Sequence, residues 1–531
     1  MLLALATRRH FALLLLIAAF ATRPAQAAET VIFSIDASRN VAPISPYIYG
    51  INDDLTTAAH LTMRRMGGNR WTAYNWVNNA SNAGSDYQFQ NDNYLGGGST
   101  PGGALIPAID NAKANGAALL VTVPIQGYVA ADKKADGDVR NSGPNYLQTR
   151  FRQEQAVKGK PFTLTPSPST KIVYQDEFVN WVKRKYPYSQ QANAKMPIWF
   201  SLDNEPDLWS DTHAEVHPDP VKYAELVAKT IDYAGGVKAV APNTLVFGPV
   251  NYGYYGFVRL QGAPDANNRD FLTYFLQKMK QAEASKGKRL LDVLDLHWYP
   301  EAESSDNIRI DGPQTTPSVV AARLQAPRSL WDRTYKEHSW ITEDWLNGPI
   351  DLLPSLKTKI AHNYPNTKLA FTEYNYGAGH HISGGIAQAD VLGIFGREGV
   401  FAATQFALET KEAFVQGAFR MYRNYDGHNG SFGDTSVFAS TNKVADTSVY
   451  ASRYSSNAKR MVIVAINKTA SPITATIRLS HAPAFDHAHV YQLTGASPTP
   501  KAKSAIVLSN PAQFSYVMPA YSVSTLNLTK N

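Results

Sequence analysis

Hydrophobic and polar positions divide the chain into two regions with different periodicities. Between about residues 47 and 422, short apolar runs alternate with segments in which apolar residues recur at helical spacing. Beyond about residue 425 the period is two, as in the segment 473–480, where Ile, Ala, Ile and Leu alternate with polar residues. Such alternation is typical of half-buried antiparallel strands. The change of pattern predicts a domain boundary at residues 424–425.

The first region contains eight apolar runs of the length expected for buried strands. Helix-period segments, such as 176–185, 220–234 and 270–284, lie between several of them. Eight repeated strand–helix units predict an α/β fold, a (β/α)8 TIM-like barrel. The predicted strands are residues 47–51, 62–66, 119–123, 198–202, 245–248, 293–297, 368–372 and 399–404.

The second region predicts a β-sandwich. Further short strands at 461–466 and 490–493 are followed by turn residues, and no helical pattern separates them. We expect the early strand 31–37 to join the same sandwich from the other end of the chain. The predicted organisation is therefore a catalytic barrel over residues 46–424 and a β-sandwich formed by residues 28–45 and 425–531.

Residues 1–27 have the features of a secretory signal peptide. Arg8 and Arg9 precede an apolar run at 11–21, and an Ala-Gln-Ala cleavage site ends at Ala27. The apolar run is too short for a permanent anchor. We expect a mature protein that is secreted or periplasmic, with no membrane anchor. The paired arginines fit twin-arginine and Sec export equally, so the route stays open.

Composition narrows the chemistry. The 531 residues include no cysteine, which excludes disulfides, thiolate metal sites and a cysteine nucleophile. The net charge of +7 falls to +4 once the three arginines of the predicted signal peptide are removed. Because this net positive charge is small and the sequence has no long run of Lys and Arg, we expect no nucleic-acid partner. Any catalysis must use oxygen and nitrogen groups.

Two glutamates follow predicted strands at positions that a barrel brings together. Glu205 comes directly after the fourth strand, and Glu373 directly after the seventh. The carboxyl ends of barrel strands share one rim, where active sites form. Glycoside hydrolysis needs a carboxyl group to protonate the leaving oxygen and a second one to attack or to activate water. Either residue alone is equally well explained as a salt-bridge or cap residue, but the pair favours catalysis.

The segments around these glutamates resemble glycoside hydrolase family 44 from about residue 30 to the end of the chain. The resemblance implies a TIM-like barrel with a β-sandwich and a secreted, retaining endo-β-1,4-glucanase. The implied substrates are xyloglucan, carboxymethylcellulose and amorphous cellulose, with Glu205 as acid/base and Glu373 as nucleophile. The matching segments include Arg-Met-Gly-Gly-Asn-Arg-Trp (65–71), Asp-Leu-His-Trp-Tyr-Pro (295–300) and Thr-Glu-Tyr-Asn-Tyr-Gly (372–377).

A glucan cleft needs aromatic platforms for the sugar rings and polar groups for their hydroxyls. We expect Asn204 to contact a substrate hydroxyl, and His297 and Tyr299 to reach Glu373 or the sugar. Arg70 is expected either to orient Glu373 or to form a structural ion pair. The candidate platforms, all of residue types that also fill cores, are Trp71, Trp76, Trp298, Tyr299, Trp331 and Trp345.

The expected reaction requires no cofactor, although the resemblance is compatible with a structural Ca²⁺. The segment His213–His217 has its glutamate in the wrong position for a zinc protease motif, so we assign no metal ligand. We expect a monomer with a β-glucan polysaccharide as its partner. Two alternatives stay open: an exo-acting, arabinofuranosidase-like glycosidase with a closed pocket, and a non-catalytic secreted glycan-binding protein.

Overall fold

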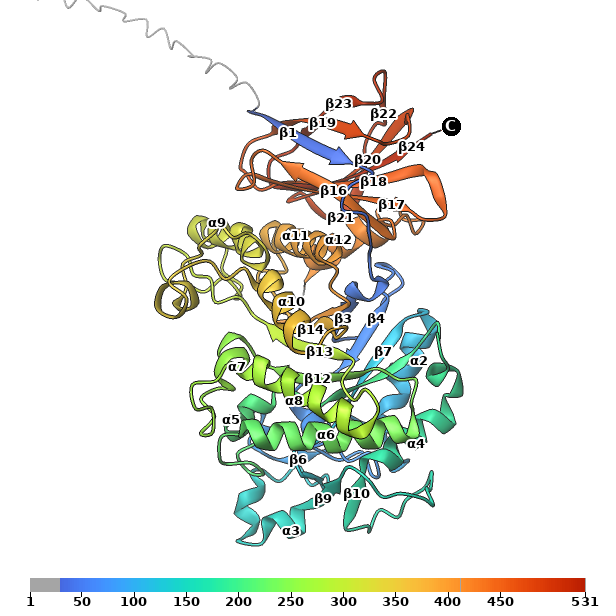
Figure 1. Ribbon diagram of the computed structural model, residues 1–531, viewed down its shortest axis with the longest axis vertical. Coiled ribbons are helices and arrows are strands. Elements are labelled where there is room, and N and C mark those ends of the chain that lie inside the picture. Colours follow the sequence, from blue (N-terminus) through green and yellow to red (C-terminus); the bar gives the residue numbers. More distant parts are fainter. Residues whose placement is uncertain (1–28, 411, 531) are drawn as a thin grey trace, which may run out of the picture.

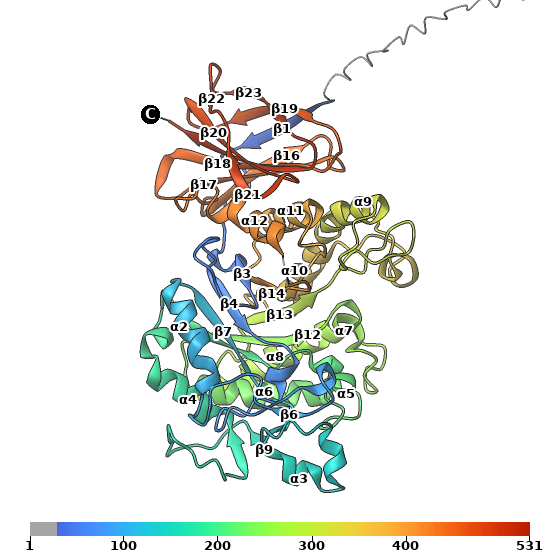
Figure 2. The same ribbon diagram turned by 180° about the vertical axis from the view of Figure 1, so that it is seen from behind.

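The computed structural model describes residues 29–410 and 412–530, so the predicted signal peptide lies outside the described residues. A barrel with its surrounding helices and a sheet-rich part follow one another along the long axis (Figure 1). Helices α11 (Ile382–Glu398) and α12 (Ala413–Arg423) lie between the two parts in both views (Figures 1 and 2). In the described ranges, no helix has the length and apolar character needed to cross a membrane.

Eight parallel strands form a closed barrel, and each predicted run overlaps one of them. The first strand is shorter than predicted because Pro46 starts a 3-10 turn, Pro46–Ile48, capped by the Ser45 side chain. In order around the barrel, the strands are β11 (Ile198–Leu202), β12 (Val246–Asn251), β13 (Val293–Trp298), β14 (Lys368–Tyr374), β15 (Ala402–Gln405), β3 (Gly50–Ile51), β4 (Met63–Met66) and β7 (Ala118–Val123).

Helices pack around the barrel, and each of the three predicted helical segments, 176–185, 220–234 and 270–284, overlaps one of them. The Asp270 side chain accepts the Thr273 N–H at 2.9 Å and so caps the start of α8, which Gly287 ends at a φ of 65°. The helices are α2 (Ile106–Ala114), α4 (Gln175–Lys185), α6 (Tyr223–Val240), α7 (Tyr254–Arg259), α8 (Phe271–Lys286), α9 (Pro317–Gln325) and α10 (Leu352–Asn363), together with α11 and α12.

The long segments after β4 and β7 lie on the part of the molecule farthest from the sheet-rich part (Figure 1). Because they follow the carboxyl ends of strands, they border the rim where active sites form. They contain the short elements α1 (Asn69–Thr72), β5 (Ser81–Asn82), β6 (Asn91–Asp92), β8 (Tyr128–Ala130), α3 (Tyr146–Arg150), β9 (Phe151–Gln155) and β10 (Ile172–Tyr174).

The sheet-rich part is one curled mixed sheet. Strand β1 lies between β16 and β19, parallel to β19, with Phe33 opposite Ile477. Tyr516 on β23 donates to Ser524 Oγ on β24 at 2.8 Å, although these strands are not neighbours, so the sheet folds over itself. Its order is β21 (Ser497–Ala502), β20 (His487–Thr494), β24 (Ser522–Thr529), β18 (Asn457–Asn467), β17 (Thr447–Tyr454), β16 (Thr435–Thr441), β1 (Glu29–Asp36), β19 and β23 (Gln513–Met518), where β19 spans Ile473–Ser480; β2 (Ala42–Pro43) pairs with β16, and β22 (Ile506–Val507) pairs with β20.

The amino-terminal end of the barrel is filled by a separate apolar cluster. Trp199 is its largest member and packs edge-on against Tyr47, with ring centroids 4.7 Å apart, and face-on against Phe247 at 5.7 Å. This plug leaves the opposite, carboxyl end of the barrel for polar groups. The buried members of the cluster are Met63, Ala118, Leu120, Trp199, Phe247, Val293, Ala370 and Ala402.

Candidate active site

Glu205 lies in a strained turn at the end of β11. Asp203 and Glu205 have φ values of 67° and 45°, in the left-handed region that non-glycine residues rarely adopt. The buried Asp203 carboxylate holds the turn: its Oδ1 accepts the Thr72 hydroxyl at 2.7 Å and the Asn204 N–H at 2.8 Å, and its Oδ2 accepts the Ile125 N–H at 2.6 Å. These bonds offset the backbone strain and fix the position of the Glu205 carboxyl group.

Glu373 is fixed by two donors at the end of β14. Arg65, on β4, donates from Nη1 to Glu373 Oε1 at 2.5 Å. The Tyr299 hydroxyl, just beyond β13, donates to Glu373 Oε2 at 2.8 Å. A register shift between β13 and β14 brings His297 opposite Glu373. Each carboxylate oxygen therefore has its own donor.

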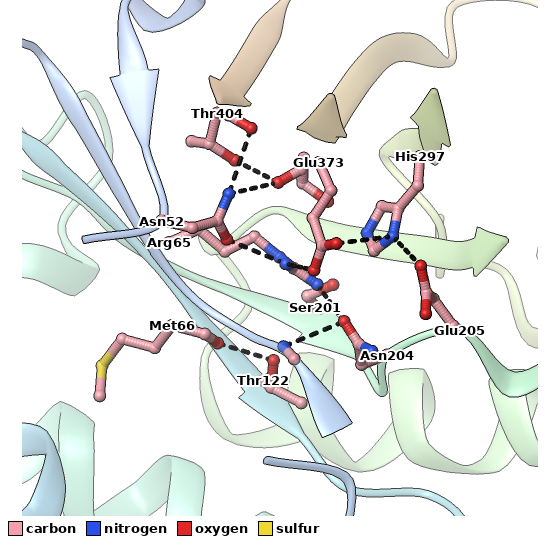
Figure 3. Close-up of polar contacts among 12 residues, drawn as sticks. Asn52, Arg65, Met66, Thr122, Ser201, Asn204, Glu205, His297, Glu373 and Thr404 are labelled. Carbon is pink, nitrogen blue, oxygen red and sulfur yellow. Dashed lines mark hydrogen bonds and ion pairs between the residues drawn. The ribbon is translucent and has the colours of Figure 1, made fainter. Parts of the chain in front are cut away.

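His297 lies between the two glutamates (Figure 3). Its Nδ1 is 2.8 Å from Glu205 Oε1 and 3.5 Å from Glu373 Oε2. One oxygen of each carboxyl group and the His297 nitrogen all lie within 4.8 Å of one another. Two residues 168 positions apart in the sequence thus face each other across a few ångströms.

Arg65, for which no role was predicted, joins both halves of the site. Besides Glu373 it binds the side-chain oxygens of Asn204, from Nη2 at 2.7 Å, and of Asn52, from Nη1 at 3.0 Å. Asn52 in turn donates to the Thr372 carbonyl at 2.9 Å, which ties the network to β14. A sequence signal did exist: an arginine inside a predicted buried strand requires a buried acceptor.

Burial and charge set the protonation states. Burial, reinforced by the negative charge of Glu373, raises the pKa of Glu205 well above its ordinary value. Burial and the nearby Arg65 guanidinium hold the pKa of His297 well below its ordinary value. Burial, followed by the charge of Glu373, raises the pKa of Tyr299, so its hydroxyl stays a donor. Glu205 therefore keeps its proton where an ordinary glutamate would lose it.

The same three groups offer atoms close enough to hold a metal ion. However, Arg65 already binds Glu373, and the environment of Glu205 favours its protonated form. A metal ligand must give up its proton, and a cation beside Arg65 would meet charge repulsion. The arrangement fits proton transfer and nucleophilic attack better than metal binding.

A cavity of about 310 Å³ opens onto both carboxyl groups. Two predicted substrate-binding residues, Asn204 and Tyr299, line it together with Glu205 and Glu373. Its other lining residues come mainly from loops at the carboxyl ends of the strands: Gly68, Asn69, Asp86, Tyr252, Asp311, Phe406 and Leu408.

The prediction of sugar platforms is wrong for Trp76 and Trp298. Both side chains are only 1% exposed. Trp76 stacks on Phe178 and Trp298 on Phe257, with centroids 5.8 Å and 6.5 Å apart. A ring enclosed on both faces cannot receive a sugar, so these two tryptophans belong to the core.

The other three tryptophans lie away from the lining of the catalytic cavity. Trp71 is buried against Tyr74, with centroids 4.8 Å apart. Trp331 lies beneath the Arg397 guanidinium, 4.1 Å from its ring, in a cavity of about 570 Å³ between the barrel and the curled sheet. Trp345 lines a different hollow beside α7. None of the three is placed to contact a sugar next to Glu205 and Glu373.

Arg70 does not contact Glu373. It binds both oxygens of Asp92, each at 2.7 Å, so of the two predicted roles the structural ion pair is the one observed. The orienting charge comes instead from Arg65, five residues earlier.

Glycoside hydrolases use two carboxyl groups that face each other across the scissile bond. A (β/α)8 barrel with such a pair at the carboxyl ends of its strands therefore defines the class of barrel glycoside hydrolases. The model of glycoside hydrolase family 44 matches residues 80–302. The chain is 41% identical to endoglucanase A of Paenibacillus lautus over 93% of its own length and 72% of that protein. The chain belongs to glycoside hydrolase family 44, as the resemblance predicted.

Two further relatives support the assignment to this family. The β-mannanase/endoglucanase A of Caldicellulosiruptor saccharolyticus is 39% identical over 88% of this chain, which spans 36% of that longer protein. A family 44 xyloglucanase of Paenibacillus polymyxa, solved with xyloglucan, is 40% identical and superposes with a TM-score of 0.89 over 95% of this chain and all of that one. The predicted fold class, a TIM-like barrel with a β-sandwich, is confirmed.

Proposed function

We propose that the protein is a secreted, retaining endo-β-1,4-glucanase that hydrolyses xyloglucan, carboxymethylcellulose and amorphous cellulose. The observation that carries the proposal is the spacing of Glu205 and Glu373, with one oxygen of each within 4.8 Å. Retaining enzymes hold their carboxyl groups about 5–5.5 Å apart, whereas inverting enzymes need about 6.5–9.5 Å to admit a water molecule. The names of the relatives, endoglucanase and xyloglucanase, support the substrate class.

In the first step, a Glu373 oxygen attacks the anomeric carbon while Glu205 donates its proton to the leaving glycosidic oxygen. The bond to the leaving sugar breaks, and a covalent glycosyl ester forms on Glu373. Arg65 and Tyr299 hold the attacking carboxylate in place through their bonds of 2.5 Å and 2.8 Å. The raised pKa of Glu205 supports its role as the acid.

In the second step, Glu205 takes a proton from water, and the water oxygen attacks the anomeric carbon. The ester bond breaks, Glu373 leaves as a carboxylate, and the product keeps its anomeric configuration. Esterification removes the charge of Glu373, which is one cause of the raised Glu205 pKa. The pKa of Glu205 therefore falls at the moment when it must act as a base.

Asn204 is suited to hold a substrate hydroxyl. Its side-chain oxygen accepts Arg65 Nη2 at 2.7 Å and the Gly68 N–H at 3.1 Å. These two bonds fix the amide and leave its NH₂ group to donate to the sugar at the catalytic cavity.

The test is to follow viscosity and reducing ends during incubation with xyloglucan and with carboxymethylcellulose, beside the Glu373→Ala variant. Endo cleavage through Glu373 gives a rapid fall in viscosity that the variant lacks. NMR spectra of the first product distinguish retention from inversion. Release of single sugars without loss of viscosity would indicate exo action, and absence of any release would indicate a glycan-binding protein.

Export and metal requirement are separate parts of the proposal. We expect secretion with cleavage after Ala27, which amino-terminal sequencing of the exported protein tests. We expect sedimentation to show a monomer.

The proposed steps use two carboxyl groups and water, so removal of metal ions by a chelator should leave kcat unchanged. A structural Ca²⁺ would be detected only as a lower unfolding temperature after chelation.

A further inference from the structure

Exposed aromatic side chains gather on one loop beside the catalytic cavity. Among the described phenylalanine, tyrosine and tryptophan residues, the three most exposed are Tyr94 at 74%, Tyr87 at 53% and Trp345 at 38%. The first two lie on or just after the hairpin of β5 and β6. The same hairpin provides Asp86 to the lining of the catalytic cavity, and Asn69, another lining residue, donates to Asp86 Oδ1 at 2.6 Å. Tyr87 thus directly follows a lining residue, and the Tyr94 ring packs on Arg70, the chain neighbour of the lining residue Asn69.

Tyr94 is held with one ring face covered. The Arg70 guanidinium carbon lies 4.0 Å from the centre of its ring. Arg70 itself is fixed by two bonds of 2.7 Å to Asp92, and Asp92 also accepts the Tyr94 N–H at 3.0 Å. Cation–π contact and backbone bonding thus orient the ring, while most of its surface stays open to solvent.

The hairpin that carries Tyr94 is tied to the rest of the molecule. Asn82 on β5 donates to Asn91 Oδ1 on β6 at 2.9 Å. Asn91 donates to the Arg150 carbonyl at the end of α3, at 2.6 Å. Both asparagines are buried. The ring is therefore presented by a braced element, as a preorganised binding surface requires.

Trp345, the third exposed ring, lies in a different environment from Tyr94. It packs edge-on against Tyr255, with centroids 5.7 Å apart, and Arg259 lies 5.4 Å from its ring. It lines a hollow other than the catalytic cavity. Tyr94 is about twice as exposed as Trp345, and the Arg70 guanidinium covers one face of its ring.

We propose that Tyr94, backed by Arg70, is an aromatic platform that stacks on a pyranose ring of the substrate chain outside the catalytic cavity. Pyranose rings have apolar faces that match an aromatic ring, and the hydroxyl of Tyr94 adds a hydrogen-bonding group at its edge. The platform lengthens the binding site on the Asn69–Asp86 side of the cavity. This inference rests on the proposed glucanase function and specifies the chain length that the site recognises.

The first test compares wild type and Tyr94→Ala on cello-oligosaccharides of increasing length and on xyloglucan. The variant should lose about two- to tenfold in kcat/KM on the long substrates, through KM, and nothing on the shortest one cleaved. Tyr94→Phe and Tyr94→Trp should keep the wild-type profile. Val517→Ala removes an exposed apolar side chain from β23 and serves as the control. An equal loss at every length, or no loss at all, would overturn the inference.

A second test does not depend on catalysis. Electrophoresis through gels containing xyloglucan measures binding directly, and the Tyr94→Ala variant should migrate faster than wild type there but equally in plain gels. Equal retardation of both proteins, or no retardation of either, counts against the platform. A wild type that is retarded but cleaves no β-1,4-glucan would contradict the proposed function alone.

Discussion

The two ends of the same eight strands differ completely in what they bury. At the amino-terminal end, Trp199 and its apolar neighbours form a dry plug. At the carboxyl end, the strands bury Arg65, Asp295, His297 and Glu373. The apolar end stabilises the barrel by burial, whereas the polar end places ionisable groups where water cannot solvate them.

Buried ionisable groups at the carboxyl end work against stability in their charged forms. Burial raises the pKa of Asp295 and that of Asp207 to about 7. The barrel therefore separates the two tasks in space: stability comes from one end and reactivity from the other, as in barrel enzymes generally. Substitutions at the two ends should have opposite consequences for activity and for folding.

The largest expected effect follows Glu373→Ala. Loss of the proposed nucleophile should reduce kcat by at least about a thousandfold. Azide should restore part of the rate, because a small anion can occupy the space of the removed carboxylate, and the product should then be a glycosyl azide of inverted configuration. Full activity of the variant on soluble glucan would show that Glu373 is not the nucleophile.

At the other end of the barrel, Trp199→Ala should lower the free energy of unfolding by about 3–5 kcal/mol. The fraction that remains folded should keep its kcat, because Trp199 contacts the apolar cluster and no group of the site. Denaturant melts and active-site titration measure the two quantities. A proportional loss of kcat per folded molecule would contradict the separation of tasks.

Arg65→Lys tests the polar end without removing its charge. Lysine cannot bind Glu373, Asn204 and Asn52 together, because it lacks the planar fork of the guanidinium group. We expect kcat to fall about ten- to a hundredfold with a smaller change in KM. The Arg64→Lys variant, at the neighbouring position on β4, is the matched control, and an equal loss in both would point to general damage.

The pH profile reports the coupling between the glutamates. Because the pKa of Glu205 is raised, kcat/KM should stay high beyond the pH at which an ordinary glutamate loses its proton, and should fall about tenfold per pH unit only above the raised pKa. In Glu373→Gln the negative charge is absent, so the Glu205 pKa should move down. NMR titration of the two proteins measures this shift, and equal Glu205 pKa values in both would contradict the proposed coupling.

The smallest effect is expected at Glu154, a buried acid of β9 outside the catalytic pair. Burial raises its pKa to about 8. Unfolded glutamate releases its proton near pH 4.3, so between about pH 4 and 8 the folded state binds more protons and stability falls as the pH rises. In Glu154→Gln this loss is absent, and the amide of Gln175 can turn to accept the new NH₂ group.

Thermal melts of Glu154→Gln and wild type across this pH range test the effect. The difference in unfolding temperature should favour the variant by about 2–4 °C more at pH 8 than at pH 4. Parallel profiles would show that Glu154 ionises freely in the folded protein.

The eight strands and the glutamate pair could be predicted from the sequence because both depend on local pattern. Buried parallel strands are continuous apolar runs, and the rim position of Glu205 and Glu373 follows from strand ends alone. Strand boundaries were less predictable where a single residue intervened, as Pro46 did in the first strand.

The partners of Arg65 could not be predicted in this way. Its bond to Glu373 joins residues 308 positions apart, and the neighbours on β3, β4 and β14 meet only when the barrel closes. The role of a tryptophan could not be predicted either, since Trp76 and Trp298 are of a residue type that can bind sugars but are buried in the core. Exposure, which decides between the two, is a property of the folded molecule.

The place of β1 in the curled sheet has a consequence for biosynthesis. This strand pairs with β16, some four hundred residues later, and in parallel with β19, which ends at Ser480. A growing chain therefore carries its first strand unpaired until nearly the whole polypeptide has left the ribosome. Closing so large a loop is slow, and an unpaired apolar strand invites association with other chains in the meantime. Chaperone contact with residues 31–35 during synthesis would protect the molecule at this stage.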